Sequence, residues 1–404
     1  MSMPSENRII IAGAGPVGLC AAYYLALHDI PVLVLEGSDN LPTDMRASTF
    51  HPPTLDMLDR FDGVTEELKS AGLIARYWQY RDRETGPVVT WDMDVLRNDT
   101  NHPYRLQVEQ WKLTRILARR LADMPHAEIR FGHPVTTATT GDDISAVTVD
   151  IGDGEATMVG RHVIGADGAN SAVRRSLDIS FDGLTFPELF LTLSTTFEFR
   201  DYMPLLTLVN YVADPREWFV LLRVEGAWRV LFPTETNEDR DHALADEQVQ
   251  ERLRTVVPGN QSFEIVHKTH YNVHQRVADR YRIGQVFLVG DSAHINNPLG
   301  GMGMNGGIQD AFNLSEKLVK VWRGEADDAL LDVYEEQRKA MALEFVQEST
   351  IRNRKMLKET NPSARLKRHD DMRRTGDDPV KAREFLLKTS MISALREYEG
   401  KDAA

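Results

Sequence analysis

Short, mostly apolar runs mark the first strands that the sequence predicts. Ile9–Ile11, Val32–Leu35, His162–Gly165 and Val286–Val289 are runs of this kind, and they are typical of parallel strands that are buried on both faces. Between the first two runs, apolar residues recur at helical spacing, namely Leu19, Ala22, Tyr23 and Leu27. The order strand, turn, helix, strand predicts an α/β protein with a Rossmann-like lobe.

The middle of the chain changes to an alternating pattern, which predicts antiparallel strands. The stretches "LFLTLSTTFEF" and "EWFVLLRVEGAWRVLFP" alternate, with a turn at Glu225-Gly226, and "ADEQVQERLRTVV" reads as a single helix. A period of two places alternate side chains on opposite faces of the sheet. On this basis one face of the first strand carries Phe219, Leu221 and Arg223. In the strand after the turn, one face carries Trp228 and Val230, and the opposite face carries Arg229 and Leu231.

Three further stretches have helical periodicity. "YRLQVEQWKLTRILARRLADM" predicts an amphipathic helix that Gln107 opens, with the apolar face Leu113, Ile116, Leu117 and Leu121. "LLDVYEEQRKAMALEFVQESTIRNRKML" and "KAREFLLKTSMISALREY" predict long helices with mixed charges. We expect the last two to clamp the lobes together or to form a contact in a homodimer.

Composition excludes several classes of function. The net charge of −14 over 404 residues argues against nucleic acid as a partner. The single cysteine, Cys20, permits neither an intramolecular disulfide nor a Cys-rich metal site, and fits the cytoplasm. The histidines lack metal-ligand spacing, so no metal is predicted. No apolar run reaches the roughly 18–20 residues of a membrane span.

A glycine-rich turn follows the first predicted strand. Gly13, Gly15 and Gly18 spell G-x-G-x-x-G, with Pro16 and Val17 between them. Such glycines permit the tight turn, the approach of a pyrophosphate and close helix–strand packing. Glu36 ends the next strand, where a carboxylate accepts hydrogen bonds from ribose hydroxyls. The pattern predicts a site for FAD or NAD.

Two later motifs stand where other parallel strands end. Asp167-Gly168 lies in "VIGADGANSAVRR", and Gly290-Asp291 lies in "VFLVGDSAH". Ligands collect at the carboxyl ends of strands in open parallel sheets. Together with the glycine turn and its acidic partner, these motifs resemble those of the group A flavin-dependent aromatic hydroxylases, the family of p-hydroxybenzoate hydroxylase and phenol hydroxylase.

The resemblance implies FAD as cofactor and assigns further contacts to it. "GDSAHINNPLGGMGMNGGIQDAFNL" is expected to seat the isoalloxazine ring, with Gly303 giving close approach and Met304 and Asn305 at the ring edge. The N–H groups at the start of the helix after Asn305 are expected to favour negative charge on the ring. Arg46, in "TDMRASTFHPP", and Gln107 match contacts of the family. The alternative interpretation of Arg46 is a solvated surface arginine, and that of Gln107 is a helix-capping residue.

The resemblance also implies the reaction. In this family NAD(P)H binds transiently and reduces FAD, O₂ adds at C4a of the flavin, and the hydroperoxide hydroxylates an electron-rich ring. We therefore expect a phenol or a hydroxylated heteroaromatic as substrate, and no catalytic side chain beyond the flavin. The backbone at Pro298 is expected beside the reacting centre. Candidate substrate anchors, each of which is otherwise a packing or surface residue, are Tyr211, Arg223 and Arg229.

The expected division has a discontinuous FAD-binding lobe, residues 1–176 and 273–350. Residues 177–272 form an inserted antiparallel substrate lobe, and residues 351–404 form a C-terminal helical tail. An FAD-dependent epoxidase, another tailoring oxidase on the same fold and a non-catalytic dinucleotide-fold binding protein are the alternatives that stay open.

Overall fold

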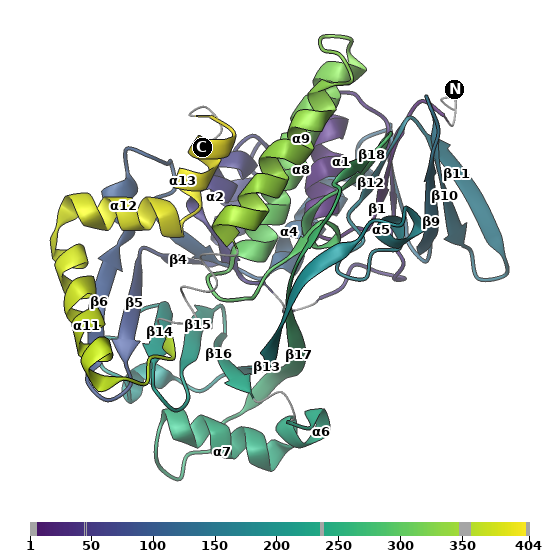
Figure 1. The fold of residues 1–404 in the computed structure, drawn as a ribbon. Coiled ribbons are helices and arrows are strands. Elements are labelled where there is room, and N and C mark those ends of the chain that lie inside the picture. Colours follow the sequence, from purple (N-terminus) through teal and green to yellow (C-terminus); the bar gives the residue numbers. More distant parts are fainter. Residues whose placement is uncertain (1–5, 44, 46, 235–237, 347–356, 401–404) are drawn as a thin grey trace.

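A six-stranded sheet forms the first lobe of the computed structural model, which describes residues 6–43, 45, 47–234, 238–346 and 357–400 (Figure 1). Five of its strands run parallel and β18 is antiparallel at the edge. The predicted apolar runs are confirmed as four central strands of this sheet. In spatial order the strands are β18 (Arg282–Ile283), β19 (Val286–Leu288), β12 (His162–Gly165), β1 (Ile9–Ala12), β2 (Val32–Leu35) and β8 (Ala127–Arg130).

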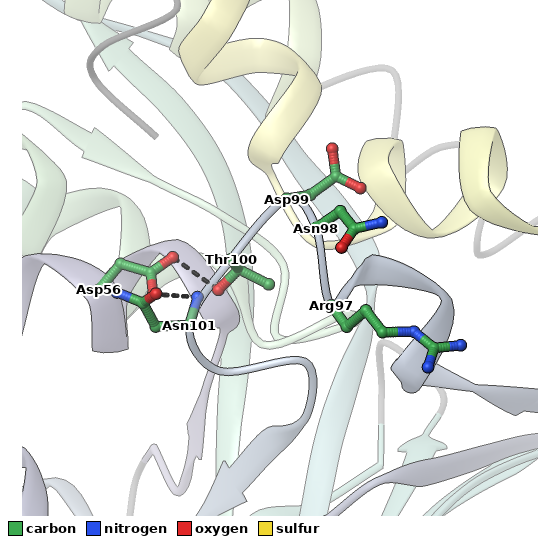
Figure 2. A pocket seen from close by; sticks show the side chains of 6 residues that line it. All are labelled: Asp56, Arg97, Asn98, Asp99, Thr100 and Asn101. Atoms are coloured by element: carbon green, nitrogen blue, oxygen red, sulfur yellow. Dashed lines mark hydrogen bonds between the residues drawn. The ribbon is translucent and has the colours of Figure 1, made fainter.

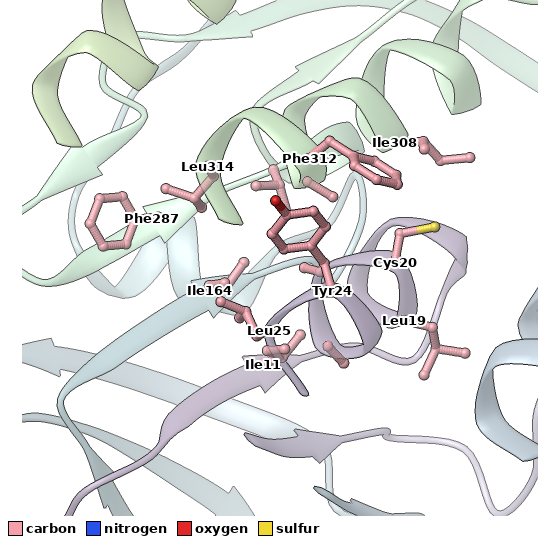
Figure 3. Packing of buried hydrophobic residues seen from close by; sticks show 14 of the residues in the cluster. Ile11, Leu19, Cys20, Tyr24, Leu25, Ile164, Phe287, Ile308, Phe312 and Leu314 are labelled. Atoms are coloured by element: carbon pink, nitrogen blue, oxygen red, sulfur yellow. The ribbon is translucent and has the colours of Figure 1, made fainter. Parts of the chain in front are cut away.

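Helices cover one side of this sheet, and a small antiparallel sheet covers the other (Figure 1). Helix α1 packs directly on α8, and Figure 3 shows Tyr24 of α1 facing Phe312 of α8, with ring centroids 5.5 Å apart. Burial of these apolar side chains supplies the driving force for the packing. The elements are α1 (Pro16–Leu27), α4 (Gln110–Ala122), α8 (Met302–Trp322), β9 (Val135–Thr140), β10 (Ser145–Asp150) and β11 (Glu155–Gly160).

An eight-stranded sheet forms the second lobe. Most neighbouring strands are antiparallel, as predicted, but β14 pairs in parallel with β5. Strands β5 and β6 come from within residues 1–176, so the sheet is built from both sides of the predicted boundary. The spatial order is β20 (His294–Ile295), β17 (Ile265–Ala278), β13 (Phe181–Thr195), β16 (Ala227–Thr234), β15 (Phe219–Val224), β14 (Val209–Ala213), β5 (Tyr77–Asp82) and β6 (Gly86–Asp92).

The two faces of this sheet pack against different parts of the chain. Phe219, Leu221 and Trp228 form one cluster with Val249 and Leu253 of α7 (Asp246–Val256), and we call this the outer face. The opposite, inner face packs against Leu299 of the glycine-rich loop and against the C-terminal helices. The predicted alternation is confirmed, and the inner face carries Trp78, Tyr211, Val220, Arg229 and Leu231.

A three-stranded sheet joins the lobes and corrects one prediction. It consists of β3 (Thr49–Phe50), β7 (Arg105–Gln107) and β4 (Leu73–Ala75). The helix expected from Gln107 begins at Gln110, because residues 105–107 extend to hydrogen-bond with β3 and β4. Pairing with strands distant in sequence overrides the local helical pattern here.

The C-terminal helices wrap around the second lobe (Figure 1, yellow). Phe385 stacks on Trp91 with ring centroids 4.3 Å apart, and Arg383 and Arg396 both donate to the carboxylate of Asp99. The tail therefore fixes the outer strands β5 and β6. Its helices are α11 (Pro362–Asp377), α12 (Pro379–Thr389) and α13 (Ile392–Tyr398).

The remaining helices are α2 (Pro52–Leu58), α3 (Val64–Ser70), α5 (Ala172–Ser176), α6 (Arg240–Ala243) and α9 (Leu330–Ala340). Of the helices in the described part of the chain, none combines the length and apolar character that crossing a bilayer requires.

Candidate active site

The carboxyl ends of the parallel strands lie level with one another. In the pairing register Ala12 of β1 stands beside Leu35 and Gly165, and Gly165 stands beside Leu288. The glycine turn, Glu36, Asp167 and Gly290 each follow one of these ends within a few residues. The structure therefore gathers the predicted cofactor motifs at one edge of the sheet.

The glycine turn has two crowded positions and one open position. A Cβ on Gly13, whose φ is +104°, would lie 2.5 Å from the Ala166 carbonyl oxygen, and one on Gly18 would lie 2.1 Å from the Gly13 carbonyl oxygen. A Cβ on Gly15 would meet no protein atom within 4 Å. Gly15 is also the N-cap of α1, with Pro16 in the first turn, and no described side chain caps this end. Open space before uncapped N–H groups fits a phosphate group.

Glu36 lies against the glycine turn. Its carboxylate accepts hydrogen bonds from the backbone N–H of Ala14 (2.8 Å) and of Ser38 (2.9 Å). A carboxylate has about four lone-pair sites, so it retains acceptors for ribose hydroxyls. Glu36 therefore shapes the turn and fits the predicted ribose contact.

Asp167 is a helix cap as well as part of the second motif. Its Oδ2 accepts from the N–H groups of Ala172 (2.7 Å) and Val173 (3.1 Å) at the start of α5, and its Oδ1 is buried without a partner. Arg174 then donates to the Ser292 carbonyl (2.8 Å), which joins this segment to the Gly290 turn. Asp291 itself is exposed. Asp167 and Arg174 thus fix the two strand-end motifs relative to each other.

Gly290 and α8 approach α1 closely. Gly290 has φ +62°, and a Cβ there would lie 3.1 Å from a methyl group of Val17. A Cβ on Gly307 would lie 2.7 Å from the same side chain. These glycines serve packing. By contrast, a Cβ on Gly303 would meet no protein atom within 4 Å, so Gly303 faces open space, as a seat for a planar ring requires.

The start of α8 differs from the prediction in its hydrogen bonding. The helix begins at Met302, four residues earlier than the predicted start after Asn305, and Asn305 is fully buried. The Asn305 side chain donates to the carbonyls of Thr49 (2.8 Å) and Gly301 (2.7 Å) and accepts from the N–H of His51 (2.9 Å). Its amide therefore fastens the loop instead of facing a ring edge. The uncapped N–H groups belong to the first turn, which includes Met304.

A hydrogen-bonded turn that includes Pro298 precedes α8. The carbonyl of Pro298 accepts from the N–H of Gly301 (3.0 Å), and Leu299 donates to Asn297. The loop is thus hydrogen-bonded internally, and its glycines serve fit. Arg46 lies outside the described residues.

A buried ionic network, which the sequence did not reveal, lies beneath this loop. Asp310 is fully buried on α8, and it accepts from the N–H of Gly290 (2.9 Å), from Nε of Arg338 (2.6 Å) and pairs with Nε2 of His294 (2.6 Å). Arg338 also donates to Glu399 (2.5 Å) and to the carbonyl of Gly306 (3.0 Å). The network fixes the Gly290 turn and α8 together.

The candidate substrate anchors lie on different faces of the second sheet. Arg223 is on the outer face, where it pairs with Glu198 (3.9 Å) and lies over the Trp228 ring. We therefore correct the prediction and remove Arg223 from the anchors. Arg229 is on the inner face and donates to the hydroxyl of Ser48 (2.8 Å) and to the carbonyl of Met45. It holds the segment beside Arg46.

Tyr211 lies near Gln107, which was predicted, and near Arg105 and His51, which the sequence did not indicate. Its hydroxyl accepts from Arg105 of β7 (3.3 Å). Two residues on, Gln107 accepts from the Thr49 hydroxyl (3.1 Å) through Oε1, while its Nε2 is fully buried without a partner. The Nε2 of His51 contacts the Gly300 carbonyl (2.7 Å). The alternation along β7 was the available signal, but the helical interpretation concealed it.

A separate polar pocket of about 310 Å³ lies beside the C-terminal helices (Figure 2). Asp56 accepts there from the Thr100 hydroxyl (2.6 Å) and the Asn101 N–H (3.0 Å). Ligand atoms of Asp56, Asp59 and His102 lie within 4.8 Å of one another. Since His102 already pairs with Asp59 (2.7 Å), hydrogen bonding accounts for the cluster, and we assign no metal to it.

The residues present fit a bound flavin dinucleotide. Gly15 and Gly303 both border open space, two helix starts lack side-chain caps, and the buried Nε2 of Gln107 needs an acceptor. A buried donor without an acceptor costs about 1–3 kcal/mol. These features lie on the glycine turn, on α8 and on β7, which are the parts that a long cofactor would connect.

Comparison with known proteins agrees with this fit. The family model described as "FAD binding domain" matches residues 6–349. The chain is 31% identical to para-nitrophenol 4-monooxygenase of Pseudomonas sp. (strain WBC-3), covering 99% of both proteins. It is 35% identical to 6-hydroxy-3-succinoylpyridine 3-monooxygenase of Pseudomonas putida (strain DSM 28022 / S16), covering 85% of this chain and 87% of the relative.

Solved structures give the same result. The crystal structure of p-nitrophenol 4-monooxygenase from Pseudomonas putida DLL-E4 matches with a TM-score of 0.90 and 30% identity, covering 96% of this chain and 99% of that one. Aklavinone-11 hydroxylase in complex with FAD and aklavinone matches with a TM-score of 0.78 and 26% identity, over 88% and 70% of the two chains. The chain therefore belongs to the FAD-binding-domain family and, within it, to the group A FAD-dependent aromatic hydroxylases.

Proposed function

We propose that this monooxygenase hydroxylates a phenol or hydroxypyridine at a substituted ring carbon para to the hydroxyl group. The observation that carries the proposal is the match to two monooxygenases over most of their length. The name para-nitrophenol 4-monooxygenase places the reaction at the carbon that bears the nitro group. In 6-hydroxy-3-succinoylpyridine, position 3 likewise bears a substituent and is para to the hydroxyl group.

The chemistry of such a substrate is consistent with oxygen transfer. A para hydroxyl group donates electrons to the carbon that is attacked, and a carbon–oxygen bond forms there. The bond to the substituent then breaks, and the substituent leaves with the electron pair. For 4-nitrophenol, the reaction with O₂, NAD(P)H and one further proton gives benzoquinone, nitrous acid, NAD(P)⁺ and water. NAD(P)H supplies the two electrons that balance the equation.

The chain binds and shields the reactants. FAD supplies the redox and oxygen-transfer chemistry when it is bound. The glycine turn and Glu36 would hold its adenosine end, and the Gln107 Nε2 would donate to the part of the cofactor beside the Gly300 loop. Leu299 packs in one cluster with Phe190 and Leu231 of the inner face. This apolar contact excludes water between the loop and the sheet.

Purified protein with bound flavin tests the proposal. We expect 4-nitrophenol or a 6-hydroxypyridine with a substituent at position 3 to stimulate NAD(P)H oxidation, with release of the substituent and a quinone-type product. Nitrobenzene, which has no hydroxyl group, is the control compound and should not be oxygenated. Stoichiometric hydrogen peroxide without an oxygenated product from any such phenol would refute the proposal and indicate an oxidase.

Three sequence-based expectations belong to the same proposal. O₂ is the expected co-substrate, and oxygen uptake during turnover measures it. A homodimer is the expected assembly, which light scattering after size-exclusion chromatography tests. The need for NAD(P)H supports a cytoplasmic location, which cell fractionation tests.

A further inference from the structure

Arg105 is a buried cation at the junction of the two lobes. Only 2% of the residue is exposed. It stands on β7, and its guanidinium lies 4.9 Å from the centre of the Trp78 ring and donates to the Tyr211 hydroxyl at 3.3 Å. Trp78 and Tyr211 both belong to the inner face of the second sheet. Arg105 thus extends from the cofactor lobe to the sheet that covers it.

The charge of Arg105 has no compensating carboxylate among the residues that the structure describes. Throughout the residues that the structure describes, no carboxylate forms an ion pair with Arg105, and its Nε is buried without a hydrogen-bond partner. Arginine stays protonated in proteins, so the group cannot escape the cost of burial by losing its proton. Buried charges are otherwise paired. A bound anionic group would balance this charge.

The surroundings favour an anionic oxygen on an aromatic ring. The Tyr211 oxygen accepts from Arg105, which leaves the Tyr211 hydroxyl proton free to donate. His51, beside the Gly300 carbonyl, is neutral, because burial and then the Arg105 charge lower the pKa of His51 to about 3. Trp78 stands edge-on to Tyr211, with ring centroids 5.6 Å apart. The side chains around Arg105 therefore offer donors and aromatic surface, and no described carboxylate pairs with its charge.

We propose that Arg105 binds the ionised oxygen of the aromatic substrate, and that Tyr211 positions the guanidinium and donates a second hydrogen bond. The proposal rests on the proposed function, since a phenol becomes this anion by losing its hydroxyl proton. A phenolate is also more electron-rich than a phenol at the para carbon. Arg105 would thus select the reactive form of the substrate.

Ligand binding to the oxidised, FAD-loaded enzyme without reductant tests the proposal. The probes are 4-nitrophenol, which ionises, and 4-nitroanisole, which has the same ring and cannot ionise. Flavin difference spectra give both dissociation constants, and the absorption band of bound 4-nitrophenol reports whether it is the anion. The variants are Arg105→Gln, Arg105→Lys and Tyr211→Phe, with Arg223→Gln on the outer face of the same sheet as the matched control.

We expect Arg105→Gln to weaken 4-nitrophenol binding about 30-fold or more and to abolish the anion band, with 4-nitroanisole little changed. Arg105→Lys keeps the charge and should bind 4-nitrophenol better than Arg105→Gln does. Tyr211→Phe should weaken 4-nitrophenol binding about 5- to 10-fold, the effect of one hydrogen bond. Arg223→Gln should bind both probes as the wild type does.

Other results overturn the proposal and separate it from the proposed function. Equal weakening of both probes in Arg105→Gln would mean that Arg105 acts through packing. Loss of FAD with unchanged 4-nitrophenol affinity would mean that it faces the cofactor. Either result leaves oxygenation of 4-nitrophenol by the wild type intact, so the proposed function stands. If the wild type binds 4-nitrophenol through Arg105 but oxygenates no para-substituted phenol, the proposed function fails and the anion site stands. If the wild type binds neither 4-nitrophenol nor a 6-hydroxypyridine with a substituent at position 3, both proposals fail.

Discussion

Replacing Asp310 by Asn tests whether the buried ionic network holds the flavin loop. The carboxylate accepts from Gly290 and Arg338 and pairs with His294. An amide has nearly the same shape but no charge, and one of its two positions donates. Asp310→Asn therefore leaves the buried Arg338 with Glu399 as its single carboxylate partner among the described residues.

The expected loss of stability follows from this arrangement. Removing one member of a buried ion pair costs about 3–5 kcal/mol. Unfolding entropy of roughly 2.1 cal/mol/K per residue gives about 0.85 kcal/mol/K for 404 residues. The melting temperature should therefore fall by about 4–6 °C.

The network also predicts a loss of stability in acid. Burial alone would raise the pKa of Asp310, but the charges and hydrogen bonds of His294 and Arg338 outweigh burial and lower it. A carboxyl with a lowered native pKa stabilises the fold above its unfolded pKa of about 3.9, and this stability is lost as the pH falls through the native pKa. Asp310→Asn should remove that part of the acid sensitivity.

Differential scanning calorimetry of the FAD-loaded enzyme and flavin content after gel filtration provide the assay. The control is Glu66→Gln, which removes an exposed ion pair with Lys69 at 2.9 Å, where Glu66 is 72% exposed. Such a pair contributes about 0–1 kcal/mol, so the control should melt within about 1 °C of the wild type. The reasoning is refuted if Asp310→Asn matches the control in melting temperature and retains its flavin.

Three other changes test separate parts of the structure. Glu36→Ala should raise the FAD dissociation constant at least tenfold through lost hydrogen bonds, about 1.5–3 kcal/mol; unchanged affinity in a flavin titration would contradict the ribose assignment. Gly303→Val should displace the flavin ring, because the side chain would enter the open space before Gly303; a normal flavin spectrum and reduction rate would place the ring elsewhere. Burial, followed by the Arg161 charge, lowers the pKa of His162 to about 4. As the pH falls from 6.5 to 4 the unfolded chain gains a proton that the native chain does not, so stability falls by up to about 1.4 kcal/mol per unit. His162→Phe should lessen this pH dependence of the free energy of unfolding, as measured by urea unfolding. An identical pH dependence in the variant and the wild type would refute the role of His162.

Local patterns predicted the parallel sheet well because its strands are buried on both faces. Ile9–Ala12 and His162–Gly165 read as apolar runs and pair with each other. The same method failed for Arg105–Gln107, whose strand forms only through pairing with Thr49–Phe50 and Leu73–Ala75. It also gave no sign that Tyr77–Asp82 joins the second sheet. Partners far apart in sequence leave no local periodicity.

The candidate site likewise contains residues that local sequence predicts and residues that only the folded chain reveals. The crowded glycines Gly13 and Gly18, and Glu36 against the same turn, were predictable, because a tight turn between a buried strand and a helix restricts the residue types at fixed spacing. Arg105 was not predictable as an anion site. A single arginine in a sequence is usually exposed, and only the folded chain shows that this one is buried without a carboxylate partner among the described residues.

Several polar residues near the cofactor site prove to hold the backbone in place. Asn305 ties α8 to Thr49 and His51, Arg174 ties the Asp167 segment to Ser292, and Arg229 ties the second sheet to Ser48. A flavin carries the reactive chemistry, so the protein needs fixed distances around it more than it needs acids and bases. A polar side chain that satisfies its hydrogen bonds within the fold meets this need. Arg105 and Gln107 differ in their position: each keeps a buried nitrogen without a hydrogen-bond partner at the lobe junction, where the proposed ligands would bind.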